Sequence, residues 1–162
     1  MLKIHWLEAR HPGVGYYDRI QPELRKLGHN VTEARRLPPS LSADVVLVGF
    51  SWFSEERPTW ARIPEFSRAA CCASSAPACL CGKVPLVVII NKEYSQMPRK
   101  LAWVRAHCIS VALSVHHDVD RFENATSVPF RRIWLGVDPE RLATPAAPPD
   151  PAPAASGYRC RL

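Results

Sequence analysis

Short apolar runs alternate with amphipathic stretches along most of the chain. Runs rich in Val, Ile and Leu predict six β-strands, over residues 2–7, 30–34, 43–50, 84–91, 109–115 and 128–135. The stretches between them predict four helices, over residues 16–27, 59–70, 96–107 and 118–124. In the first of these, Tyr17, Ile20, Leu24 and Leu27 recur at helical spacing, and Gly28 follows as a C-cap.

This alternation predicts the fold class. Continuous apolar strands separated by helices are typical of a parallel sheet that is covered on both faces. Right-handed crossovers then give an α/β, Rossmann-like, doubly wound sheet. Ligands of such sheets bind where the strands end, so the residues after each strand are the candidates for chemistry.

The chain length and two stretches of unusual composition define the expected domain boundaries. The 162 residues fit one domain, which we place at residues 1–142. Residues 69–82 (AACCASSAPACLCG) form a low-complexity, cysteine-rich insert, and residues 143–162 form a Pro/Ala-rich tail that we expect to be disordered.

Six cysteines are present, four of them in or near the insert. Since no apolar signal core follows the first Met, we expect a cytoplasmic protein without a disulfide framework. The cysteines also lack the paired CxxC spacing of structural zinc sites, so no metal is expected. The longest apolar run, 84–90, is too short to span a membrane.

The net charge is +6, from 21 basic and 15 acidic residues. This balance favours anionic partners. The arginines are scattered, however, and no aromatic residues interleave with them as a stacking platform requires, so nucleic acid is not the expected partner.

Gly13 and Gly15 lie in the turn between the first strand and the first helix. Glycines there allow a ligand to approach the backbone closely, and the helix N-terminus offers N–H groups to a phosphate. The third glycine of a dinucleotide fingerprint is missing and no acidic residue closes the second strand, so NAD is not expected. A plain tight turn is the alternative.

Polar residues also follow two later strands. Lys92 and Glu93 come after the most apolar strand, where they can hold a sugar hydroxyl or a phosphate, or form a solvated ion pair. His116 and His117 follow the next strand; adjacent histidines are expected to project in different directions and to make a poor metal pair. They either donate to a sugar or phosphate oxygen or lie at the surface beside an N-cap, Asp118.

Together these segments resemble a known family. The loop 91–94 (NKEY), the turn 115–118 (VHHD) and the segment 136–139 (GVDP), each after a predicted strand, are similar to the N-terminal half of a GT-B glycosyltransferase. The closest resemblance is to the CgeB-type spore-protein glycosyltransferase-like branch. It covers about residues 1–142, without the insert.

The resemblance implies transfer of a sugar from a nucleotide-sugar donor to an acceptor, in a cleft between two Rossmann-like domains. The N-terminal domain serves mainly the acceptor, and the C-terminal domain holds most donor contacts. The sequence continues past GVDP only as the Pro/Ala tail, so we expect a truncated half-enzyme that is inactive alone.

In that half-enzyme Gly13, Gly15, Lys92, Glu93, His116 and His117 would bind substrate, with no cofactor and with the catalytic residues unassigned. The alternative is a non-catalytic Rossmann-like module that binds an anionic ligand or a protein partner.

Overall fold

The computed structural model describes residues 1–7, 20–38, 41–49, 66–67, 81–90 and 95–133. Within these ranges lie six strands, β1 (Lys3–Leu7), β2 (Asn30–Ala34), β3 (Val45–Val48), β4 (Leu86–Ile90), β5 (Val111–Ser114) and β6 (Phe130–Arg132). The helices of the same ranges are α1 (Ile20–Lys26), α3 (Met97–Ala106) and α4 (Val119–Thr126). Every predicted strand is therefore present, several of them shorter at one or both ends.

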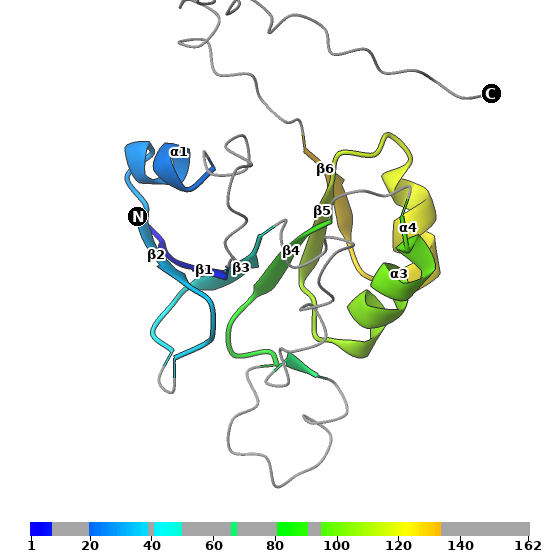
Figure 1. The fold of residues 1–162 in the computed structure, drawn as a ribbon, viewed down its shortest axis with the longest axis horizontal. Helices are drawn as coiled ribbons and strands as arrows, with labels where there is room; N and C mark the ends of the chain where they lie inside the picture. The colour runs from blue at the N-terminus through cyan, green and yellow to red at the C-terminus, as the bar shows by residue number, and fades with distance from the viewer. Residues whose placement is uncertain (8–19, 39–40, 50–65, 68–80, 91–94, 134–162) are drawn as a thin grey trace, which may run out of the picture.

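All six strands belong to one parallel sheet in the order β2-β1-β3-β4-β5-β6 (Figure 1). The chain runs outward from β1 to β2 and then returns to the other side of β1 with β3. This reversal is the topological switch point of a doubly wound sheet. The predicted α/β, Rossmann-like class is confirmed.

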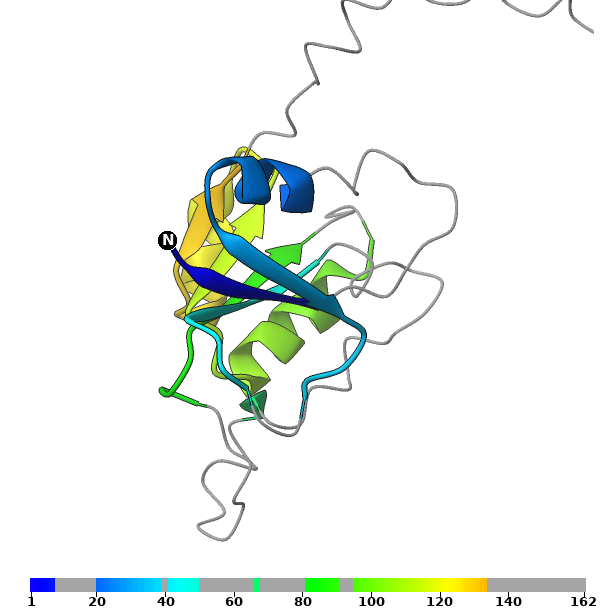
Figure 2. The same cartoon turned by 90° about the vertical axis from the view of Figure 1, so that its left-hand side faces the viewer.

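Helices cover both faces of the sheet, with α1 on one side and α3 and α4 on the other (Figures 1 and 2). Alternate strand residues point to opposite faces, so two cores form. The larger core lies under α3 and α4 and includes Val46, Val88 and Phe130, while the smaller lies towards α1 and includes Trp6 and Ile89. All five residues of β4 are apolar, as expected of a strand that is covered on both faces.

The helix ends follow local chemistry. Gly28 has φ of 83°, as expected of a C-cap after α1. Asp118 is the N-cap of α4, where its side chain accepts from the backbone N–H of Arg121 at 3.4 Å. At the other end of α4, the Thr126 hydroxyl donates to the Phe122 carbonyl at 2.8 Å.

Some predictions fall outside the described residues. This is so for residues 16–19 of the first helix, for most of the predicted helix 59–70, for most of the insert 69–82 and for the tail 143–162. Of the helix 59–70, only residues 66–67 are described, and Ser67 forms an isolated antiparallel bridge with His107.

One prediction about the cysteines is wrong. We expected no disulfide, but Cys81 and Cys108 form one, with their Cα atoms 5.5 Å apart. The two cysteines are 27 residues apart in the sequence, so sequence spacing alone does not show that they are close in space. Cys81 precedes β4 and Cys108 precedes β5, and these strands are neighbours in the sheet, so their starting ends meet.

No helix within the described ranges is both long enough and apolar enough to cross a membrane.

Candidate functional site

The six parallel strands end at one edge of the sheet, which we call the carboxyl edge. At the switch point the backbone N–H of Gly49, just after β3, donates to the carbonyl of Leu7, the last residue of β1, at 2.8 Å. This bond brings the carboxyl ends of β1 and β3 together. Gly13, Gly15, Lys92 and Glu93 follow β1 and β4 in the chain, but they lie outside the described residues.

His116 and His117 follow β5 at the carboxyl edge, as predicted. Their rings do not project apart, however. They stack with centroids 4.4 Å apart and an interplanar angle of 22°. The side-chain alternation of a strand ends with β5 at Ser114, so it does not govern this pair. Each ring therefore covers one face of the other, and the exposed side chain of the pair is that of His117.

Hydrogen bonds fix the position and the tautomer of His116. Its backbone N–H donates to the hydroxyl of the buried Ser114 at 3.1 Å, and its Nδ1 lies 3.0 Å from the backbone N of Asp118. Since a backbone N–H is only a donor, Nδ1 must accept. In the neutral ring the proton therefore sits on Nε2, which becomes a donor of fixed position.

Phe122 packs against the ring of His116, and Phe130 packs against Phe122. The His116 ring lies 5.2 Å from that of Phe122 in α4, and Phe122 in turn lies 5.6 Å from Phe130 in β6, both in tilted geometry. Tilted aromatic pairs at these distances are favourable beyond the area they bury. The histidine pair is thus continuous with the larger core.

The alternative interpretation of this turn, an N-cap beside surface histidines, is compatible with a binding role. Asp118 does cap α4, but it does so with its side chain, and it holds His116 Nδ1 with its backbone. Neither contact uses Nε2 of His116. The cap therefore positions the histidine through Nδ1 and makes no use of its Nε2 donor.

Lys100 is a candidate that sequence analysis missed. It occupies the first turn of α3, near the carboxyl edge, and is only 2% exposed. Helical side chains lean towards the N-terminus of their helix, which here is the carboxyl edge. The sequence did hold a signal for its burial. Lys100 lies three residues after Met97 and four before Val104, a spacing that places all three on the face of α3 that packs on the sheet.

In the described part of the chain, no group of three or more His, Cys, Asp or Glu side chains is placed to hold a metal ion. Among the described residues, the carboxyl edge carries an imidazole N–H donor and a pair of stacked imidazole rings, and Lys100 lies in the first turn of α3. These groups suit an oxygen-rich or anionic ligand.

No family model matches the chain, and neither the curated proteins nor the solved structures contain a significant match.

Proposed function

We propose that this chain is the N-terminal half of a GT-B-type glycosyltransferase and that its carboxyl edge binds a nucleotide sugar or a glycosyl acceptor. The observation that carries the proposal is the fixed Nε2 donor of His116, at the end of β5 in a doubly wound sheet. Ligands of such sheets bind at this edge.

The chemistry of the ligand follows from His116 and the ring stacked on it. Sugars and diphosphates present many oxygen acceptors, which an imidazole N–H can bind. The flat face of the stacked pair, with His117 exposed, suits a pyranose or a nucleobase. In this proposal Gly13 and Gly15 approach the phosphates or the acceptor, while Lys92 and Glu93 line the same cleft.

Calorimetric titration with uridine- and guanosine-diphosphate sugars tests the role of His116. We expect His116→Ala to weaken binding about tenfold, because it removes one donor to a charged or hydroxyl oxygen. His29→Ala is the matched control, since His29 lies between α1 and β2 at the opposite edge. Equal affinity of the wild-type protein and His116→Ala would contradict the assignment.

The alternative is a non-catalytic module that binds an anionic ligand, and the net charge of +6 favours it. Both proposals place the ligand at the carboxyl edge, and they differ in turnover. Release of nucleoside diphosphate, with a sugar-modified acceptor, supports the transferase when the chain is paired with a donor-binding domain. Binding without release in the same mixture supports the module.

A further inference from the structure

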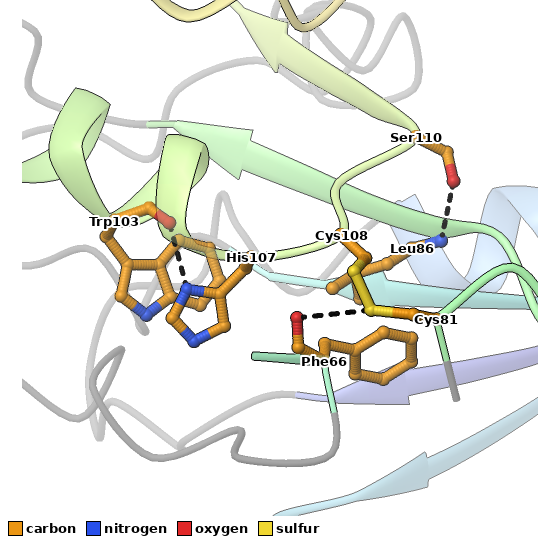
Figure 3. The surroundings of a disulfide bond; sticks show 7 residues. All are labelled: Phe66, Cys81, Leu86, Trp103, His107, Cys108 and Ser110. Atoms are coloured by element: carbon orange, nitrogen blue, oxygen red, sulfur yellow. Dashed lines mark hydrogen bonds between the residues drawn. A yellow bond between two sulfur atoms is a disulfide. The ribbon is translucent and has the colours of Figure 1, made fainter. Parts of the chain in front are cut away.

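The disulfide Cys81–Cys108 lies beside the starts of β4 and β5 (Figure 3). This edge of the sheet is opposite to the carboxyl edge. The two cysteines enclose β4, residues 91–94 and α3 in one loop. The bond therefore ties the entrance of β4 to the segment between α3 and β5. It constrains the unit formed by β4 and α3.

A third segment meets the disulfide. The backbone N–H of Cys108 donates to the carbonyl of the buried Phe66 at 2.8 Å, and Ser67 pairs with His107 in an isolated bridge. The Cys81 sulfur lies 3.7 Å from the same Phe66 carbonyl (Figure 3). Phe66, which precedes the insert, and Cys81, near the end of the insert, are thus both held to Cys108.

Both redox states fit these surroundings. Cys81 and Cys108 are partly exposed, so a dissolved thiol or disulfide can reach them. A disulfide sulfur carries no proton, but a reduced Cys81 thiol can donate to the Phe66 carbonyl at the distance observed. The bond from Leu86 N–H to the Ser110 hydroxyl, at 3.2 Å, and the stacking of His107 on Trp103 do not require the disulfide.

We propose that Cys81 and Cys108 form a reversible thiol–disulfide switch that controls the stability of the β4–α3 unit. This proposal does not depend on the proposed transferase function. The oxidant is a low-molecular-weight disulfide of the glutathione class. One cysteine thiolate attacks it and releases one thiol, which gives a mixed disulfide. The second cysteine then displaces the other thiol. The protein loses two thiol protons and two electrons, and one disulfide becomes two thiols.

Oxidation stabilises the fold mainly because it restricts the unfolded chain. For a loop of this length the unfolding equilibrium constant should fall by about two to three orders of magnitude. In a domain of this size that corresponds to a rise in Tm of roughly 10 °C.

The experiment equilibrates the folded full-length protein in buffers of varied reduced-to-oxidised glutathione ratio, traps free thiols by alkylation and maps the peptides. We expect the Cys81–Cys108 linkage to disappear over a defined range of ratios while the protein stays folded. Tm should fall by roughly 10 °C across that range.

Two serine variants separate this bond from the other cysteines. Cys81→Ser should show the lower Tm under all conditions, and Cys160→Ser should behave as the wild-type protein does. A linkage of Cys81 to another cysteine would overturn the proposal. Reduction of the bond only when the protein unfolds would also overturn the proposal, since that result describes a purely structural disulfide. The wild-type titration decides the matter even when Cys81→Ser does not fold.

Discussion

Phe122→Ala should lower the free energy of unfolding by about 3–5 kcal/mol, with a fall in Tm of roughly 10 °C. Phe122 is 7% exposed and packs between His116 and Phe130. Removing its ring leaves a cavity in the larger core and takes away the support of His116. Since domains of this kind are stable by about 5–15 kcal/mol, the loss is a large part of the total. Urea denaturation followed by circular dichroism measures it.

Two comparison variants make this result specific. Phe122→Leu keeps most of the apolar volume and should cost less than about 1.5 kcal/mol. Leu27→Ala removes an apolar side chain that is 73% exposed at the end of α1, and it should change stability by less than about 0.5 kcal/mol. A Phe122→Ala protein as stable as Leu27→Ala would show that α4 does not pack on the sheet in this way.

The free energy of unfolding should also fall as the pH drops from 7.5 to 5.5. Burial lowers the pKa of His107 below its usual 6.5, although the Trp103 carbonyl, 2.9 Å from Nδ1, raises it in part. Burial likewise lowers the pKa of His5, with a smaller opposing effect from the backbone of Arg36. As the pH falls through about 6.5 the unfolded chain binds protons first, so unfolding becomes more favourable.

The size of this pH effect has an upper bound. Each histidine contributes at most about 1.4 kcal/mol per pH unit, so the pair contributes at most about 2.7 kcal/mol per unit. Denaturation curves at several pH values measure the slope. The double variant His5→Gln/His107→Gln, whose amides do not titrate, should show a smaller slope over the same range. A wild-type slope that persists in the double variant would assign the effect to other groups.

The sequence predicted the sheet well because strand burial has a direct signature. The apolar residues of β4 required a strand covered on both faces, and the structure buries Leu86, Val88, Ile89 and Ile90. The boundaries were less accurate: the strand predicted to begin at residue 128 begins at Phe130. Val128 and Pro129 extend the apolar run ahead of the strand, so composition alone overestimates strand length.

The candidate site was predictable only in part. Topology brought His116 and His117 to the carboxyl edge, as expected from their place after a strand. Their stacking was not foreseen, because it depends on the turn between Ser114 and Asp118 and on Phe122 beneath it. The disulfide was missed for a similar reason, since strand order and not sequence spacing brings Cys81 to Cys108.

The measurement that tests the central claim most directly is an amide NMR titration of the isotope-labelled chain with the same diphosphate sugars. We predict that chemical shifts change at Gly49, His116, His117 and Asp118, which follow β3 and β5 at the carboxyl edge. The amides of Gly28, Cys108 and Ser110, at the opposite edge, should stay unchanged. Shifts centred on the opposite edge, or no shifts up to the solubility limit of the ligand, would contradict a sugar-nucleotide site at the carboxyl edge.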